Sequence, residues 1–495
     1  MFLARLLVLF SLVCISCAHS SFEQKQLKHA LDFATSNRLE LEILLQHYTY
    51  DSLKLEAAKF LIRNMPHCYS YQQGGEMDSV KRVRTYYSPF GQIDQTYARR
   101  WGHYTYRNLL KIYDAHIITA EYLIDNIDRA FDNWQKRPWN RSLSFEDFCE
   151  YLLPYRIGDE PLEEWRELYE KKYGYLLDSI YKGGDVVEAA NLVSRHLQEP
   201  VFIYCEDFEL PHIGPRYLFS HRYGSCVDAA DIVTYAFRAV GIPCMEDTDA
   251  RGGHVWNVVR DTTGRDVPIW YIASEAVRGS RDTGGYKRGK VYRPMYGFQE
   301  EKAAHLGDDW KSVPLLFYHP YMKDVSYAYY PDTLRILTGI PDGEVCYLAH
   351  FHEAHWWSCA CARSASGKME IPNLESELVY LPMKYTKGNY YPSGFPFWFA
   401  GGEINTFLPD WEKTVKVRLY RKYPVYGWLR SFMGHVVGGT FEGSMTKNFE
   451  DGKTLYEIAD TPVIARNRIF LNKSVKCRYI RYKADNDKCA ELAEM

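Results

Sequence analysis

The sequence predicts an α+β protein of several domains, with a helical N-terminal region, a mixed core and β-rich C-terminal modules. Three observations predict this order. Apolar residues recur at three- and four-residue intervals before residue 205, a helix-starting cysteine and two strand-like runs follow within 206–300, and short alternating runs between turn residues dominate afterwards. A length of 495 residues suits roughly three to four domains.

Composition limits the class of protein. Hydrophobic residues make up 46% and charged residues 25%, as expected of a globular chain with buried cores. The net charge of −3 and the lack of a long basic run argue against a nucleic-acid-binding protein. Aromatic residues reach 16%, which fits β-sheet cores better than it fits carbohydrate-binding surfaces.

Residues 1–20 have the pattern of a targeting signal. Arg5 precedes an apolar run, Leu6–Ile15, that is too short to span a bilayer as a helix. The run ends either in a signal-peptidase site around Ser16 and Ala18 or in a loose lipobox that would make Cys17 a lipidated N-terminus. We favour the lipoprotein, which would be exported to the periplasm or the cell surface and held at the membrane only by its lipid.

The cysteine count argues against a disulfide framework. Of 12 cysteines, Cys14 and Cys17 belong to the signal and anchor, which leaves ten. Setting Cys226 aside as a free thiol leaves nine, an odd number. Buried free cysteines are therefore expected.

The region 21–205 is predicted to be a helical scaffold. Asp51 and Ser144 are plausible helix starts, since short polar side chains cap helix N-termini. The segments with helical periodicity are Leu39–Leu45, Leu53–Ile62, Phe145–Leu153 and Val186–Leu197.

The region 206–300 contains the candidate catalytic residues, and the first of them is a cysteine at a helix start. Ser225 is a good N-cap and Asp228 stands where a capping box needs its acid, so Cys226 becomes the first helical residue. Gly241 and Pro243 end the helix. The free amides and dipole of a helix start favour a thiolate.

A histidine and a carboxylate follow on two strand-like runs. His254–Asp261 alternates, a turn follows, and Asp266–Glu275 returns. If Asp261 pairs with Asp266, Glu275 lies diagonally across from His254 on the same face, close enough to orient the imidazole. Asp266 would be about 20 Å away, so we favour Glu275 as the acid. A bulge at Pro268 is the alternative that would slip this register.

These residues together predict an activated thiol nucleophile. Cys226 would attack, His254 would take its proton and Glu275 would hold the imidazole tautomer. The Cys226 backbone N–H is a natural donor to the oxyanion. The candidates for a second oxyanion or substrate-positioning donor are Trp256, Tyr223 and Tyr217.

The same motifs resemble the transglutaminase-like cysteine superfamily. Gly224-Ser-Cys226-Val-Asp, the helix ending at Pro243 and Gly253-His254-Val-Trp256 appear in that family's order. The resemblance implies a papain-like α/β core with a Cys-His-Asp triad, although the acid here would be Glu275. More widely, the chain is similar to exported Bacteroidetes proteins with this domain, notably over Leu55–Pro66 and Phe145–Trp165.

Two β modules are expected after the core. The first, a β-sandwich over 301–425, contains alternating runs such as Val345–Phe351, Leu378–Leu381 and Val415–Tyr420. The second covers 426–495, and its end, Arg478–Met495, is similar to the late strands of discoidin-like carbohydrate-binding jelly rolls. That module starts late and stops early, which suggests a partial or distant relative.

Two weaker patterns occur in the first β module. His350, His352 and His355, followed by Cys359 and Cys361, lack the spacing of a zinc protease, so exposed strand residues are favoured over a metal site. Aromatic residues that could form a sugar-stacking platform are better explained by core packing; they are Trp356, Trp357, Tyr390, Tyr391 and Trp398. No metal and no cofactor are expected.

The favoured function is an exported thiol enzyme that cleaves an amide in a peptide, glycopeptide or cell-wall peptide through a thioester on Cys226. Hydrolysis is favoured over transfer because water is always present and the sequence marks no amine pocket. The alternative is an inert cell-surface protein that binds glycan or peptide through its C-terminal modules.

Overall fold

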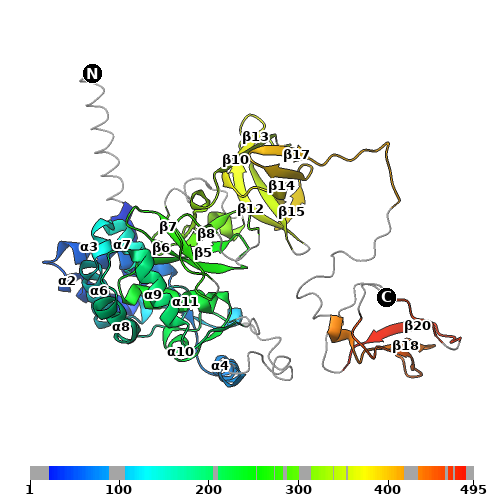
Figure 1. The fold of residues 1–495 in the computed structure, drawn as a ribbon, viewed down its shortest axis with the longest axis horizontal. Helices are drawn as coiled ribbons and strands as arrows, with labels where there is room; N and C mark the ends of the chain where they lie inside the picture. The colour runs from blue at the N-terminus through cyan, green and yellow to red at the C-terminus, as the bar shows by residue number, and fades with distance from the viewer. Residues whose placement is uncertain are drawn as a thin grey trace. The chain divides into compact units, whose positions relative to one another are not determined.

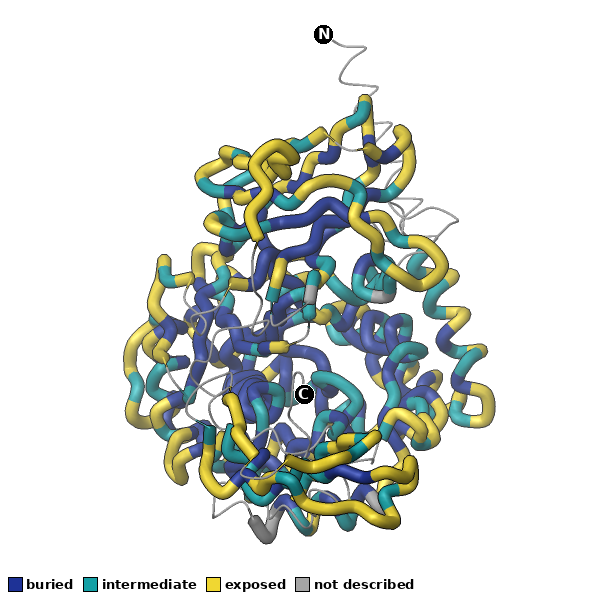
Figure 2. The backbone as a smooth tube through the Cα atoms, turned by 90° about the vertical axis from the view of Figure 1, so that its right-hand side faces the viewer, coloured by how far each residue is buried: buried dark blue, intermediate teal, exposed yellow. Residues whose placement is uncertain are grey.

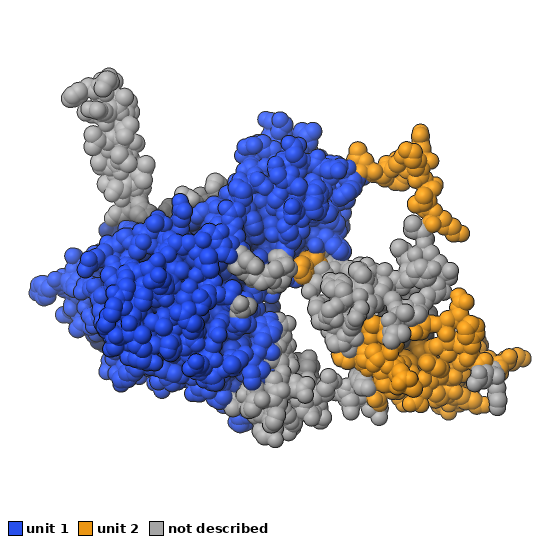
Figure 3. Space-filling view, in the orientation of Figure 1, with its two compact units in different colours: residues 1–93, 104–351, 356–407 blue, residues 94–103, 352–355, 408–495 orange. Residues whose placement is uncertain are grey.

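The structure is a computed structural model. It describes residues 22–87, 106–204, 210–251, 253–272, 274–281, 287–299, 314–337, 339–352, 355–416, 433–462, 467–471 and 474–485. Residues 1–20, which are expected to be a targeting signal, lie outside these residues. The described chain is mixed α/β, with helices in its N-terminal part and sheets in its C-terminal part (Figure 1). It divides into two compact units, 1–93 with 104–351 and 356–407, and 94–103 with 352–355 and 408–495 (Figure 3).

The N-terminal region forms amphipathic helices, as the periodicity predicts. Two of the predicted caps are confirmed: Asp51 accepts a hydrogen bond from the Lys54 backbone N–H, and Ser144 accepts one from that of Asp147. The helices are α2 (Arg38–His47), α3 (Ser52–Asn64), α4 (Glu76–Tyr87), α6 (Ala120–Lys136), α7 (Phe145–Tyr151), α8 (Arg166–Tyr175) and α9 (Val186–Leu197). Strands β1 (Tyr69–Tyr71) and β2 (Lys111–Tyr113) pair between them.

The first helices bury their apolar faces in one hydrophobic cluster. Leu41, Leu61, Leu123 and Phe148, from four different helices, are fully buried there. Tyr296, from the loop after strand β8, joins the same cluster. The helical region is therefore continuous with the core that follows, and Figure 2 shows this buried interior in dark blue.

The core places one long helix against a five-stranded sheet. Helix α11 (Cys226–Ala239) packs on strands β5 and β6 and also against α8, α9 and α10 (Pro215–Ser220). The sheet order is β7-β6-β5-β8-β9. Its strands are β5 (Cys244–Asp249), β6 (Val255–Arg260), β7 (Asp266–Ile269), β8 (Val291–Pro294) and β9 (Met322–Asp324). A short parallel pair, β3 (Ile203–Tyr204) and β4 (Tyr223–Gly224), lies next to the start of α11 in the sequence.

Two further sheets follow in the same unit. Strands β10 (Asp332–Leu337) and β13 (Lys368–Leu374) form one, and the order β12-β11-β14-β16-β17, with β15 on β14, forms the other. Leu334 and Ile371 from the first sheet share a hydrophobic cluster with Leu348 and Phe397 from the second. The strands of the larger sheet are β11 (Val345–His352), β12 (His355–Arg363), β14 (Leu378–Thr386), β15 (Asn389–Pro392), β16 (Phe397–Ala400) and β17 (Glu403–Thr406).

These sheets are tied directly to the core. The Glu375 carboxylate accepts hydrogen bonds from the backbone N–H groups of Arg288 and Gly289 at 2.5 and 2.9 Å. The Tyr292 hydroxyl, on β8, donates to the Cys359 carbonyl at 2.8 Å. A second hydrophobic cluster joins Tyr292 to side chains of β11 and β14. The core and the following sheets thus form one packed body.

The second unit contains a small antiparallel sheet of order β19-β18-β20. Its strands are β18 (Thr440–Ser444), β19 (Lys453–Glu457) and β20 (Tyr479–Lys483). The run Val415–Tyr420 falls largely outside the described residues. Among the helices that the structure describes, none has the length and apolar character needed to cross a membrane. The cysteines in the described ranges are all free thiols.

Candidate active site

Helix α11 begins as its sequence predicts. The Ser225 side chain accepts from the Val227 backbone N–H, and Asp228 accepts from the Ser225 backbone N–H at 2.8 Å, which completes the capping box. Cys226 is the first helical residue and is 6% exposed. Its sulfur therefore belongs to the turn in which free backbone N–H groups stabilise a negative charge.

Two neighbours hold this first turn. Asp228 forms a buried ion pair with Arg84 of α4 at 2.6 Å, so the capping acid is itself anchored. Gly224 leaves no room for a side chain, because a Cβ there would lie 2.2 Å from both the Asp228 carboxylate and the Arg84 guanidinium. The chain entering α11 thus requires glycine at this position.

The other end of α11 is closed by side chains from the helical region. Arg137 donates to the Val240 carbonyl at 2.8 Å, and both Trp139 and Asn140 donate to the Gly241 carbonyl at 2.9 Å. Arg166 donates to the Arg238 carbonyl at 3.3 Å. These donors satisfy the carbonyl groups that a helix leaves unpaired at its C-terminus.

Contacts between α11 and the sheet show how far along the helix Cys226 lies relative to the position of His254 along β6. Arg238 donates to the carbonyl of Cys244, which pairs with Val259, whereas Asn257 donates to the Ala230 carbonyl at 3.0 Å and to the Thr234 hydroxyl at 2.9 Å. Residues nearer the start of α11 therefore lie level with residues nearer the start of β6. From the level of Asn257, Cys226 is about 9 Å along the helix and His254 about 10 Å along the strand. Both residues lie at the same end of this layer.

His254 lies immediately before β6 and is 6% exposed. Its ring packs against Trp270 with centroids 4.6 Å apart and against Trp256 at 5.6 Å. Both tryptophans belong to the hydrophobic cluster that contains Cys226. The two tryptophans therefore form an apolar wall around the imidazole, at the end of the sheet where the thiol lies.

The expected hairpin register is wrong by one residue. Arg260, rather than Asp261, pairs with Asp266. The Asp261 carboxylate accepts from the backbone N–H groups of Thr263 and Arg265, so Asp261 belongs to the turn. No bulge forms at Pro268, which pairs with Val258.

The reason for choosing Glu275 as the orienting acid fails with this register. Strand β7 ends at Ile269, and the chain then turns, with the Ser274 backbone N–H donating to the Trp270 carbonyl. Glu275 is exposed, and its carboxylate forms an ion pair with Arg195 of α9 at 2.6 Å. The Glu275 carboxylate is therefore not held diagonally across from His254, where it was expected.

The three candidates for a second oxyanion donor have different surroundings. The Trp256 indole N–H donates to the Tyr329 hydroxyl at 2.9 Å and the residue is fully buried, so this donor is already used. Tyr223 is buried on β4 beneath the Arg84 guanidinium. Tyr217 is half-buried and stacks on His221 with centroids 4.4 Å apart.

A cavity of about 360 Å³ adjoins the thiol end of the core. Val227 and Val255, which directly follow Cys226 and His254, both line it. Its remaining wall combines aromatic and charged side chains, among them His67, Tyr296, Arg238, Glu246 and His212. The cavity thus reaches the chain neighbours of Cys226 and His254, which do not themselves line it.

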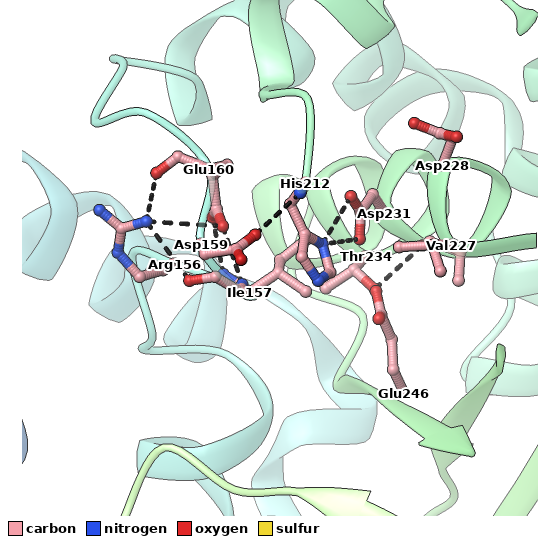
Figure 4. A network of polar contacts seen from close by, with 12 residues as sticks. Arg156, Ile157, Asp159, Glu160, His212, Val227, Asp228, Asp231, Thr234 and Glu246 are labelled. Carbon is pink, nitrogen blue, oxygen red and sulfur yellow. Dashed lines mark hydrogen bonds and ion pairs between the residues drawn. The ribbon is translucent and has the colours of Figure 1, made fainter. Parts of the chain in front are cut away.

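His212, which lines the cavity, belongs to an imidazole–carboxylate pair that sequence reasoning missed. His212 Nδ1 lies 2.9 and 3.0 Å from the two carboxylate oxygens of Asp231 on α11, which is fully buried (Figure 4). Glu246 accepts from the Thr234 hydroxyl at 2.6 Å. No spacing signal joins these residues, because they come from a loop, a helix and a strand.

The weaker sequence patterns have mixed outcomes. His350, expected to be exposed, is 1% exposed on β11. Within the described ranges no group of His, Cys, Asp or Glu side chains could hold a metal. Trp356 and Tyr390 pack against a hydrophobic cluster, as the core-packing interpretation requires. The remaining aromatic candidates stay 36–47% exposed: Trp357, Trp398 and Tyr391.

No protein-family model, curated protein or solved structure matches this chain.

Proposed function

We propose that this protein is an exported thiol enzyme that hydrolyses an amide bond in a peptide, glycopeptide or cell-wall peptide through a thioester on Cys226. The observation that carries the proposal is the pairing of a capped helix start at Cys226 with His254 at the same end of the sheet, beside a cavity. The motifs Gly224–Asp228 and Gly253–Trp256, which resemble the transglutaminase-like superfamily, support a papain-like core in which these two residues have these roles.

The chemistry needs only groups at this end of the core. His254 takes the thiol proton, and the sulfur bonds to the carbonyl carbon as the carbon–nitrogen bond breaks. The leaving amine takes the proton from His254. Water then attacks the thioester, passes a proton to His254, and the sulfur leaves as a thiolate. The Cys226 backbone N–H, which lies at a helix start, donates to the oxyanion of each tetrahedral intermediate.

The rest of the proposal follows the sequence. Residues 1–20 would export the chain, with Cys17 as the lipid anchor, and the sheets after residue 301 would hold glycan or peptide near the cell surface. The partly exposed side chains of Trp398 and Tyr391 support such contacts. The C-terminal sheet of β18, β19 and β20 would be a partial discoidin-like module.

The thiol can be tested without knowing the substrate. Alkylation by iodoacetamide is followed at each cysteine by peptide mass spectrometry across pH, with Cys477, which is half-buried, as the reference thiol in the same chain. At pH 6 we expect Cys226 to react about tenfold faster than Cys477 despite its burial, because a thiolate is the reacting species. His254→Ala should remove that advantage.

Amide hydrolysis tests the reaction itself. Cys226→Ala should abolish the release of amine from a panel of peptides and glycopeptides, while leaving the unfolding midpoint within a few degrees of the native chain. The enzyme proposal fails if Cys226 is alkylated more slowly than Cys477 at every pH and if its alkylation rate is the same in the His254→Ala variant. The protein would then be better described as an inert binding protein.

A further inference from the structure

The His212–Asp231 pair has no role in the chemistry described above, yet several contacts fix its position. The His212 backbone N–H donates to Asp159 at 2.9 Å while its ring is held by Asp231. A Cβ at Gly158 would lie 2.2 Å from the ring, so only glycine allows the imidazole to lie there. Backbone and ring are both fixed, which leaves the imidazole one orientation.

The exposed part of this imidazole is its far side. The His212 side chain is 24% exposed while that of Asp231 is 0% exposed. Since Nδ1 faces Asp231, the accessible edge carries Nε2. His212 lines the cavity, and within the described residues Nε2 makes no hydrogen bond. Its accessible nitrogen can therefore meet a ligand in the cavity.

The surroundings decide the charge of the ring. Burial opposes the cation, but the nearby carboxylates of Asp231, Asp159 and Glu160 raise the pKa of His212 well above its ordinary value. A protonated imidazole donates from both nitrogens, so Nε2 is a hydrogen-bond donor. By contrast, burial lowers the pKa of His67, on the same cavity, to about 3, so that ring is neutral.

The other cations of the wall already serve the fold. Arg156 donates to the Asp114 carboxylate and to the carbonyls of Gly158 and Glu160. Arg238 donates to the carbonyls of Cys244, Arg156 and Glu150. Both are structural links between elements. On the described part of the wall, His212 differs from these two arginines because its Nε2–H can donate to a ligand.

The spacing connects this donor to the thiol. Asp231 follows Cys226 by five helical residues, about 7.5 Å along the axis. An extended peptide covers about 3.3 Å per residue, so this axial rise alone corresponds to about two residues of substrate, while the five residues also turn about 140° around the helix. Val227, Val255 and His212 line the same cavity, which therefore reaches the chain neighbours of Cys226 and His254, although neither of those two residues lines it.

We infer that His212 binds a hydrogen-bond-accepting oxygen of the substrate, a carboxylate or a peptide carbonyl, about two residues from the bond that Cys226 attacks. The inference rests on the proposed function, because it assumes that the substrate occupies this cavity. Asp231 acts through His212 as a positioning residue.

Three thiol reagents of one length test the inference on the full chain. They are methanethiosulfonates that carry a pentyl, a 4-carboxybutyl or a 4-carbamoylbutyl chain, which reach about 7 Å from the sulfur. The rate at Cys226 is measured for each, and the two polar reagents are expressed relative to the pentyl reagent, which reports the thiol alone. We expect the native chain to favour at least one polar reagent about tenfold, because hydrogen bonds to a charged donor are strong.

Two variants separate binding from folding. His212→Gln keeps an N–H for Asp231 but removes the charge, and the double variant H212F/D231L removes both polar groups so that no buried carboxylate is left unpaired. If only the carboxylate reagent loses its advantage in H212Q, the ligand group is a carboxylate. If both polar reagents lose theirs in the double variant, it is a carbonyl.

The inference is overturned if both polar reagents keep the same rates relative to the pentyl reagent in H212Q and in the double variant. Failure of the proposed function would look different. The pentyl reagent would then react slowly with Cys226 in the native chain, and its rate would ignore His254→Ala, whatever the relative rates of the polar reagents.

Discussion

The two ends of helix α11 are built for opposite purposes. At its C-terminal end, Arg137, Trp139, Asn140 and Arg166 all donate to backbone carbonyls, and the surrounding residues are buried. At its N-terminal end, Cys226 follows a capping box, and the next residue lines a cavity. The comparison teaches that the two helix ends are satisfied differently, by side-chain donors at one end and by a capping box at the other, and in the proposed function the capped end presents the thiol.

The difference is also one of chemistry. Guanidinium and indole donors neutralise the negative end of the helix, where a cation is favoured. At the positive end, the Asp228 carboxylate and the Ser225 side chain cap the backbone N–H groups, and a negative charge on the Cys226 sulfur would be favoured there. Each of the following predictions alters one end or its surroundings, from the largest expected effect to the smallest.

Arg166→Met should have the largest effect on stability. The guanidinium is buried and donates to Asn126, to the carbonyls of residues 152–154 and to the carbonyl of Arg238. Removing it leaves buried acceptors unpaired, so we expect a loss of about 3–5 kcal/mol in the free energy of unfolding, measured with urea. Arg335→Met, at an exposed ion pair with Glu370, is the control and should lose less than about 1 kcal/mol. Equal losses would mean that the closed end is not special.

His67→Phe should flatten the acid side of the stability profile. Burial lowers the pKa of His67 to about 3, so the folded chain holds a neutral ring that the unfolded chain protonates below about pH 6.5. The stability from this residue is complete above pH 6.5 and is lost as the pH falls toward 3, by about 2 kcal/mol between pH 6.5 and 5.

Phenylalanine retains the stacking on Tyr321, whose ring centroid lies 3.5 Å from that of His67, while removing the titration. Unfolding in urea at several pH values measures the slope in both chains. His47→Phe, on an exposed residue of α2, is the control and should leave the slope as it is. An unchanged slope in His67→Phe would show that this ring is not held neutral.

Ser225→Ala should weaken the open end in two ways. Loss of an N-cap lowers the free energy of unfolding by about 1 kcal/mol. The alkylation rate of Cys226 at pH 6 should fall as well, because the amides of the first turn are less well ordered around the sulfur. Ser144→Ala removes a similar cap from α7 and is the matched control, with a comparable loss of stability but no change at Cys226.

Glu275→Gln should have the smallest effect. Its carboxylate is exposed and, within the described part of the chain, forms an ion pair with Arg195 on the surface, so we expect the loss of stability to be less than about 0.5 kcal/mol. Alkylation of Cys226 should also be unchanged within twofold. A large fall in that rate would restore Glu275 as the acid that orients His254.

Local signals in the sequence predicted the parts of the fold that short-range forces decide. The caps at Asp51, Ser144 and Ser225 formed because a short polar side chain satisfies free amides within its own turn. The end of α11 near Gly241 follows from the same kind of signal, since that residue has φ of 80°.

The errors lie where tertiary contacts decide. The hairpin register depended on whether Asp261 belongs to a strand or a turn. Its carboxylate accepts hydrogen bonds from two backbone N–H groups of the turn, which places Asp261 in the turn. Glu275 was placed by extending that register past Ile269, where the strand ends. His212 and Asp231 are 19 residues apart and meet only because α11 packs where it does, so periodicity could not pair them.

The hydrogen bonds from Arg288 and Gly289 to Glu375 have a consequence for how this protein melts. A core and sheets that share hydrogen bonds and a hydrophobic cluster cannot lose one part without exposing the other. Heat should therefore disrupt them together, in a single calorimetric peak. A chain shortened after Tyr330 would lack that support and should precipitate or be degraded rather than yield an isolated thiol domain.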